Sequence, residues 1–172
     1  MVPEQFDILD HSGNQTGITQ NKGEPLNSGQ YYLGVHVYLF NSSGEFLIQQ
    51  RALDKKFLPG GWDIVAEHTM AGETSVESAI RGVQEELGIS IPSADMLFVG
   101  RIFRHEMHHI TDVYFAQIST AINELVLQPT EVIVAKFISK EEMATLVEQM
   151  HYRPEDYKKL VLQHIWDGVA LQ

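Results

Sequence analysis

The stretch "AGETSVESAIRGVQEELGI", Ala71 to Ile89, reads as a charged helix that the chain enters through a glycine turn. Thr74 and Glu77 form a T-x-x-E capping box, which predicts where the helix begins, and Gly88 is placed to end it. Apolar residues recur at the spacing of one helix face: Val76, Ile80, Val83 and Leu87. We therefore expect this face to pack on a core. The other side, toward a site or solvent, carries Ser78, Gly82, Glu85 and Glu86.

Length and composition exclude several classes of function. The chain has 172 residues, enough for one domain with a hydrophobic core. Its formal charge of −11 argues against a nucleic-acid partner, because such a surface needs basic groups. The chain has no cysteine, which excludes disulfides, thiolate metal sites and cysteine nucleophiles. No apolar run approaches the ~20 residues that span a bilayer, and the start lacks a secretory signal pattern, so we expect a cytoplasmic protein without a membrane partner.

Runs rich in aromatic and β-branched residues predict strands on both sides of this helix. Before the helix, the N-terminal segment 1–29 holds a small hairpin and a loop, and strands follow at 31–40, 46–51 and 62–66. After the helix, strands are expected at 96–103, 109–118 and 131–138.

Two further helices are expected within residues 139–172. Ser139 and Glu142 form a second capping box, and Pro154 suits the first turn of a final helix. Strands before and after a central helix, followed by two C-terminal helices, predict an α/β (α+β) fold. We expect a single domain over residues 1–172, an α/β/α sandwich with a mixed sheet.

The acids of the central helix suggest a metal site. Glu85 and Glu86 are neighbours, so their side chains point ~100° apart on a helix and cannot act as a tight pair alone. They would share a metal with Glu73 if the glycine turn folds back over the helix, and Arg81 lies four residues before Glu85, close enough to orient it. Hard oxygen ligands suit Mg²⁺ or Mn²⁺. The alternative is a solvated helix face with a salt bridge.

Residues 67–89, "EHTMAGETSVESAIRGVQEELGI", resemble the signature of the Nudix hydrolases. That signature is Gly, five residues, Glu, seven residues, Arg-Glu-aliphatic, one residue, Glu-Glu, one residue, Gly-aliphatic. Seven of its nine specified positions match: Glu73, Arg81, Val83, Glu85, Glu86, Gly88 and Ile89. The likeness covers nearly the whole chain. The runs "FDILDHSGNQTG" and "LIQQR…PGGWD" are most similar to the bacterial branch related to isopentenyl diphosphate isomerase.

The resemblance implies a single Nudix domain and a Mg²⁺-dependent hydrolase, with Mn²⁺ as an alternative metal. Its small-molecule substrate would be a nucleoside diphosphate derivative or a similar organic pyrophosphate. In the family, the signature forms a loop–helix–loop that holds the metal against the diphosphate. Carried over by position, Glu85 and Glu86 are metal ligands, and Arg81 braces the loop through Glu73. Dimers are common in the family, so a homodimer is a candidate assembly.

Two positions depart from the signature. Position 82, where a third glutamate is expected, is Gly82, and position 67, where a glycine is expected, is Glu67. One hypothesis is compensation, in which Glu67 returns the carboxylate lost at position 82 and the bare helix face leaves space for it. The others are loss of strong metal binding, with the fold kept for another use, and a general base elsewhere. We favour a retained but altered metal site with Glu67 among its ligands.

Further candidates lie outside the helix. A histidine at the place of His68 binds metal in the related isomerases, although a loop histidine more often forms ordinary hydrogen bonds. Arg51, at a strand end, is expected to bind substrate phosphate, whereas Lys55 and Lys56 are interpreted as surface charges first. Trp62 aligns with a family aromatic and is a substrate-binding candidate, with structural packing as its more ordinary role.

The run "RHEMHH", Arg104 to His109, invites a metal interpretation. Alternation along the strands would scatter these side chains over both faces, so we expect an exposed hairpin tip instead. Asp112 and Glu106 are weaker candidates to reach the site from the sheet.

Two other functions compete with hydrolysis. Isomerase chemistry, as the resemblance implies, needs a cysteine two positions before the equivalent of His68, and the residue there is Ala66. The second competitor is a Nudix-fold protein that binds a nucleotide or another phosphate ligand without turnover. Gly82 and Glu67 are the features that support it. Loops outside the signature choose the substrate in this family, so the fold does not identify it.

Overall fold

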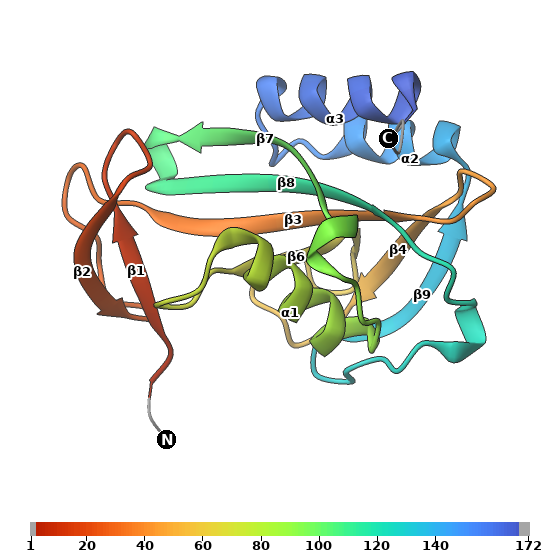
Figure 1. Cartoon of the computed structure of the whole chain (residues 1–172), viewed down its shortest axis with the longest axis horizontal. Helices are drawn as coiled ribbons and strands as arrows, with labels where there is room; N and C mark the ends of the chain where they lie inside the picture. Colours follow the sequence, from red (N-terminus) through yellow and green to blue (C-terminus); the bar gives the residue numbers. More distant parts are fainter. Residues whose placement is uncertain (1–2, 169–172) are drawn as a thin grey trace.

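A mixed β-sheet between helices forms the body of the protein (Figure 1). The structure is a computed structural model that describes residues 3–168. Helix α1 covers one face of the sheet, and α2 and α3 cover the other. A separate two-stranded hairpin lies at one end of the sheet. The α+β fold with a mixed sheet, predicted from the sequence, is confirmed.

Seven strands form the main sheet, in the order β5-β4-β3-β8-β7, with β6 paired to β3 and β9 paired to β4. β3 and β8 run parallel, and the other pairs are antiparallel. The hairpin consists of β1 (Gln5–Leu9) and β2 (Gln15–Asn21). The strands of the main sheet are β3 (Tyr32–Phe40), β4 (Phe46–Arg51), β5 (Trp62–Asp63), β6 (Val65–His68), β7 (Leu97–Arg104), β8 (His109–Gln117) and β9 (Val132–Ile138).

Helix α1 (Ser75–Leu87) begins and ends where the sequence predicts. The Thr74 hydroxyl accepts a hydrogen bond from the backbone N–H of Glu77, and the Glu77 carboxylate accepts one from the backbone N–H of Thr74. Gly88 follows the helix with φ of 71°, a left-handed conformation that a glycine adopts without strain. The capping box therefore fixes the entry of α1, and Gly88 fixes its exit.

The C-terminal helices are α2 (Lys140–Gln149) and α3 (Glu155–Asp167). Ser139 and Glu142 form the predicted capping box of α2. Pro154 is the N-cap of α3, one residue before its first turn. Short 3-10 helices lie at Ser93–Asp95, His105–Met107 and Ile122–Glu124. Within residues 3–168, none of the helices has the length and apolar character needed to cross a membrane.

The core has one layer on each face of the sheet. Side chains alternate along β3, so Val35, Val37 and Leu39 pack toward α1 while Tyr38 and Phe40 pack toward α2 and α3. The predicted apolar stripe of α1 enters the first layer through the fully buried Val83 and Leu87, with Val76 and Ile80 packed at its edge. The second layer takes Met143 and Val147 from α2, and Tyr157, Val161 and Ile165 from α3.

The sheet divides at the end where the site lies. β3 pairs with β4 only at Leu39 and Phe40, and its neighbour over Gly34–Val37 is β6. β4 pairs there with β5 instead. The segment 62–68 therefore changes its partner strand between β5 and β6, and it brings residues of both arms of the sheet to one opening.

Candidate active site

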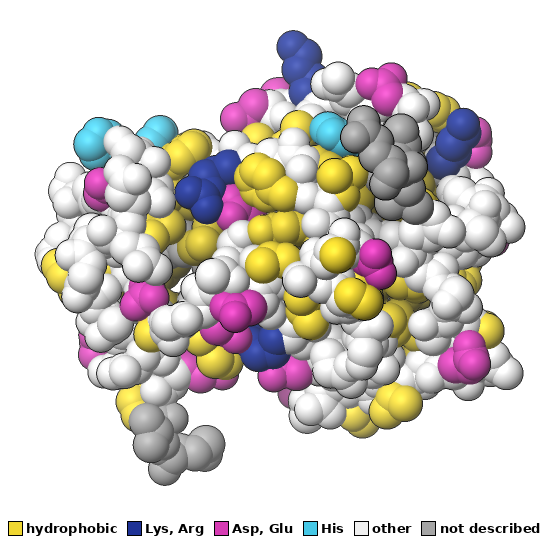
Figure 2. Space-filling view, viewed as in Figure 1, with side chains coloured by type: hydrophobic (Ala, Val, Ile, Leu, Met, Phe, Trp, Pro, Cys, Tyr) yellow, Lys and Arg dark blue, Asp and Glu magenta, His cyan; other side chains and the backbone are white. Residues whose placement is uncertain are grey.

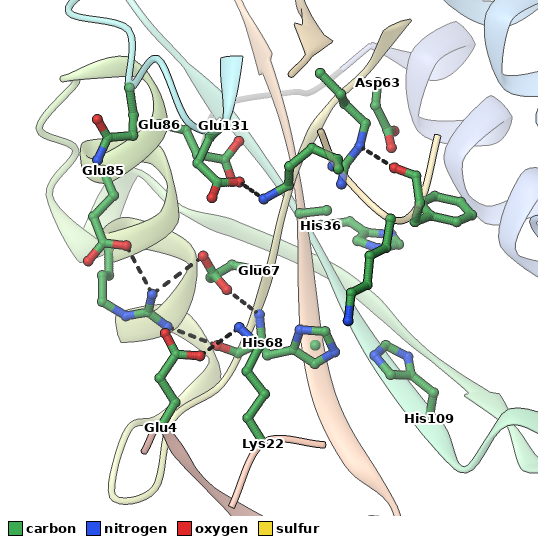
Figure 3. Close-up of a pocket in the computed structure, with 18 of the residues that line it drawn as sticks. Glu4, Lys22, His36, Asp63, Glu67, His68, Glu85, Glu86, His109 and Glu131 are labelled. Carbon is green, nitrogen blue, oxygen red and sulfur yellow. Dashed lines mark hydrogen bonds and ion pairs between the residues drawn. The ribbon is translucent and has the colours of Figure 1, made fainter. Parts of the chain in front are cut away.

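A pocket of about 930 Å³ opens beside α1, and residues of both arms of the divided sheet line it. In Figure 3, Glu67, Glu85, Glu86 and Glu131 lie along one side of this pocket, and His36, His68 and His109 lie along the other. A volume of this order is typical of small-molecule sites, which measure roughly 300–1,000 Å³.

Arg81 holds together the loop and the helix at the acidic side of the pocket. Its Nε and Nη2 atoms donate to the two carboxylate oxygens of Glu73, at 2.7 and 3.0 Å. Nη2 also donates to the backbone carbonyl of His68 at 2.8 Å, which ties α1 to the end of β6. The predicted brace through Glu73 is therefore a bidentate contact, the geometry for which a guanidinium is suited.

Two more carboxylates share the Arg81 guanidinium. Its Nη1 atom lies 3.3 Å from an oxygen of Glu85 and 3.5 Å from an oxygen of Glu67. Burial alone would lower the pKa of Arg81, but Glu73, Glu67 and Glu85 outweigh it and raise the pKa. We call the set Glu67, Glu73, Glu85 and Glu86, with Arg81, the acidic wall.

The two departures from the signature, Gly82 and Glu67, face each other. A Cβ atom at position 82 would lie 3.1 Å from Cβ of Glu67 and 3.5 Å from its Cγ. The side chain of Glu67, carried by β6, thus fills the space beside α1 that a side chain at position 82 would enter. The glycine costs the helix roughly 0.5–1 kcal/mol relative to alanine, whereas any larger side chain at position 82 would crowd Glu67.

Glu86 is the most deeply buried acid of the acidic wall, with 5% of its surface exposed. Burial raises the pKa of Glu86 to about 8; a short hydrogen bond from Nε2 of Gln49 opposes this rise, and the carboxyls of Glu67 and Glu131 add to it. Burial likewise raises the pKa of Glu67. Glu85 differs, because about half of its side chain, 53%, is exposed.

The acidic wall offers oxygen ligands to a divalent cation but not a finished ligand set. Within residues 3–168, no three acidic or histidine side chains are arranged to hold a metal by themselves. Mg²⁺ usually takes only one or two protein carboxylates and completes its shell with water and substrate phosphate. Glu86 is buried beside two other carboxyls and forms no ion pair with a described Lys or Arg, so a bound cation would favour its ionised form over its protonated form.

The structure does not bring His68 together with the acidic wall. Glu67 and His68 are consecutive in β6, so their side chains point to opposite faces of the strand. The His68 ring stacks on Phe6 at 5.3 Å between centroids and meets His109 edge-on at 5.6 Å. Burial lowers the pKa of His68, so this ring is neutral at pH 7.

The exposed tip predicted for Arg104–His109 is wrong for His109. His105, Glu106 and Met107 are exposed, as expected, in a 3-10 turn. His109 is the first residue of β8 and lines the pocket, because β8 continues the sheet beside β3. Burial lowers the pKa of His109 to about 3, which keeps the ring neutral.

Basic groups concentrate in the pocket of this acidic protein. Seven of the twelve Lys and Arg residues of the chain line it, Arg51, Lys55 and Lys56 among them. Arg51 donates to the carbonyl of Phe57 at 3.0 Å, and Lys55 forms an ion pair with Glu131. On the face shown in Figure 2, by contrast, the Lys and Arg groups lie apart from one another. Lys56 is exposed, as expected of a surface charge, and Lys55 is partly buried; both also line the pocket.

Trp62 and Asp112 lie away from the pocket. Trp62 packs with the core layer of α2 and α3 and lines a second, shallower hollow, where Lys136 lies 4.5 Å from its ring centre. Asp112 accepts two hydrogen bonds from Arg101, at 2.6 and 2.8 Å. Glu106 contacts Arg104 at 3.4 Å in the exposed turn.

Several pocket residues escaped the sequence analysis. Glu131 lines the pocket and contacts Lys55, and Gln49, which does not line it, donates to Glu86. His36, Asp63 and Arg153 come from β3, β5 and the segment between α2 and α3. Alternation in β5 carried a usable signal, because Trp62 packs on the core and its neighbour Asp63 must then point to the other face.

Comparisons with known proteins agree with this geometry. A profile of the NUDIX domain matches residues 30–161. An uncharacterized Nudix hydrolase of Listeria monocytogenes is 36% identical over 152 residues, which cover 88% of this chain and 89% of that protein. An isopentenyl-diphosphate Delta-isomerase of Citrobacter koseri is 29% identical over 77% of this chain and 75% of its own length.

A solved structure shares the fold. The Deinococcus radiodurans protein DR0079 superposes with a TM-score of 0.73 at 17% identity, over 95% of this chain and 99% of its own. The family profile covers most of the chain, including β3 to β9 and helix α1 with its acidic wall. The chain therefore belongs to the NUDIX domain family.

Proposed function

We propose that the protein is a Mg²⁺-dependent hydrolase that cleaves the diphosphate bond of a nucleoside diphosphate derivative or a similar organic pyrophosphate. The observation that supports the proposal is the position of Glu67 against Gly82: a carboxylate from β6 lies beside the helix position where the signature has a glutamate. Decay of the site would not require the two departures to be complementary in space.

The residues divide into those that hold a metal and those that hold the substrate. Glu85, Glu86 and Glu67 would bind Mg²⁺, or Mn²⁺ in its place. The bound cation would neutralise charge on the phosphoryl oxygens and lower the pKa of a water molecule. Arg81 and Glu73 position these carboxylates, because the bidentate contact between them fixes the loop against α1. Exact placement of reacting groups contributes several kcal/mol in such reactions.

Arg51, Lys55 and Lys56 would bind the diphosphate. Each is a cation that lines the pocket, and a pocket with seven Lys and Arg side chains in a chain of charge −11 favours an anionic ligand. The pocket volume of about 930 Å³ accommodates a nucleotide-sized molecule.

The competing proposal is a Nudix-fold protein that binds such a ligand without turnover. The raised pKa of Glu86, about 8, supports this alternative, because the carboxyl is protonated at pH 7 unless a cation is bound. A hydrolase would therefore form product in a metal-dependent way, whereas a binding protein would form no product.

A substrate screen with a matched pair of variants tests the proposal. Nucleoside di- and triphosphates and nucleoside diphosphate conjugates are incubated with Mg²⁺ or Mn²⁺, and phosphate-containing products are measured. We expect turnover of at least one compound, a loss of ~100-fold or more in Glu86→Gln, and no change in Glu148→Gln, an exposed acid on α2. Thermal stabilisation by a nucleotide without any product would contradict hydrolysis and support the binding protein.

A further inference from the structure

The deep end of the pocket, opposite the acidic wall, holds buried polar atoms without partners. Asp63 is 1% exposed, and its Oδ2 atom has no hydrogen-bond partner within residues 3–168. Nε of Arg153 is also without a partner among these residues. Both side chains line the pocket. An unsatisfied buried polar atom destabilises the folded protein, so a ligand that bonds to both atoms would recover that loss on binding.

Asp63 and Arg153 are close but do not satisfy each other. Nη2 of Arg153 lies 3.8 Å from Oδ2 of Asp63, beyond the ~2.7–3.2 Å of a hydrogen bond. The other carboxylate oxygen of Asp63 accepts from the backbone N–H of Ile64 at 2.9 Å, which leaves Oδ2 as the free acceptor. A ligand edge that donates one hydrogen bond and accepts another would fit between the free acceptor and the free donor.

Aromatic rings lie beside Arg153. The Arg153 guanidinium lies over the rings of Tyr152 and Tyr157, at 5.1 and 5.4 Å from their centres. The ring of Phe57, which lines the pocket, meets Tyr152 edge-on at 5.1 Å. The two tyrosine rings hold the Arg153 guanidinium, and the ring of Phe57 is a flat wall of the pocket itself. A flat wall near a donor and an acceptor suits a planar heterocycle better than a flexible polyol.

Arg51 connects this end of the pocket with the acidic wall. Burial raises the pKa of Asp63 and that of Glu86, and the positive charge of Arg51, which lines the same pocket, opposes the rise at both carboxyls. A ligand whose phosphates lie at Arg51 would therefore have its metal-facing side toward Glu86 and its other end toward Asp63.

We propose that Asp63 and Arg153 form the subsite for the nucleobase of the substrate, with the free Oδ2 of Asp63 accepting from a base N–H and Nε of Arg153 donating to an adjacent ring nitrogen or carbonyl. This inference rests on the proposed function, which puts the phosphates of the ligand at the Arg51 end of the pocket. The residues that would select the base lie outside the signature, in β5 and between α2 and α3.

Metal-free binding separates the subsite from hydrolysis. The dissociation constants of the four nucleoside 5′-monophosphates and of ribose 5-phosphate, which lacks a base, are measured by calorimetry. We expect at least one nucleoside monophosphate to bind roughly tenfold or more tightly than ribose 5-phosphate. In Asp63→Asn, which is nearly isosteric, this ratio should fall at least about fivefold. In Asp54→Asn, an exposed acid that also lines the pocket, the ratio should not change.

The outcomes are distinguishable. If the wild type binds ribose 5-phosphate as tightly as every nucleoside monophosphate, the subsite is refuted. This result needs neither turnover nor a folded Asp63→Asn variant. An unchanged ratio in folded Asp63→Asn refutes it as well. Selective binding of one base without any turnover would instead refute hydrolysis and leave the subsite standing.

Discussion

The acidic wall and the Asp63–Arg153 pair are two ends of one pocket, and they differ in how their charges are satisfied. In the acidic wall, Arg81 bonds to Glu73 and contacts Glu67 and Glu85, so the groups hold one another in place. At the other end, Nη2 of Arg153 lies 3.8 Å from Oδ2 of Asp63, and each residue keeps an atom without a hydrogen-bond partner in the described part of the chain. A preorganised end is suited to chemistry and an unsatisfied end to recognition, and the predictions below test this division.

Beyond the Glu86→Gln variant of the substrate screen, the largest expected effect comes from the Arg81 brace. Arg81→Lys keeps the charge but loses the bidentate contact with Glu73, so turnover should fall by roughly 10–100-fold. The matched control is Arg101→Lys, because Arg101 forms an equivalent bidentate contact with Asp112 outside the pocket. Both variants should lower Tm by about 2–6 °C, and only the first should reduce turnover. Equal turnover in the two variants would show that the acidic wall has no special need of its brace.

A smaller effect should appear in the pH dependence of stability. Burial raises the pKa of Glu86 from its ordinary value to about 8, so in the metal-free protein its stabilising contribution is complete below about pH 4.5 and is lost as the pH rises through about 8. The Tm of the wild type relative to Glu86→Gln should therefore fall between pH 5 and pH 8.5. Stabilisation by Mn²⁺ should grow over the same range. Parallel Tm curves for the two proteins would contradict the buried, uncompensated carboxyl.

The smallest effect is expected at the substrate cations. Lys55→Gln should raise KM about two- to fivefold at low salt with little change in kcat, and the difference should shrink at high salt because partly exposed charges are screened. Lys158→Gln, on α3 and away from the pocket, is the control. A kcat effect without a KM effect would place Lys55 in the chemistry instead of in ligand binding.

The same contrast explains what the sequence could and could not predict. The acidic wall depends on residues 67–89, which are contiguous. Helix periodicity is enough to place Arg81 beside Glu85, and the resemblance to the Nudix signature supplied the brace to Glu73. The strands, the helices and the fold class followed from similar local patterns. Local spacing thus carries the information for this half of the site.

The other half depends on which strands are neighbours. His109 enters the pocket because β8 runs parallel to β3, and Arg153 reaches Asp63 from the segment between α2 and α3. Trp62 packs on the core while Asp63 lines the pocket, a choice of face that the strand period allows but does not decide. The contact between Gly82 and Glu67 likewise needed the register of β6 against α1, although the sequence suggested the exchange.

The central claim is that Glu67 takes the place of the helix carboxylate at position 82, and the affinity for Mn²⁺ tests it most directly. Calorimetry is carried out on the wild type, Glu67→Gly, Gly82→Glu and the double variant that restores the family arrangement. Each single variant should bind Mn²⁺ at least about tenfold more weakly than the wild type. Glu67→Gly lacks a carboxylate ligand, and Gly82→Glu places a Cβ atom 3.1 Å from Cβ of Glu67, which displaces that side chain. The double variant should return to within about threefold of the wild type. A double variant that binds no better than the two single variants, or a Glu67→Gly variant that binds as well as the wild type, would contradict the account.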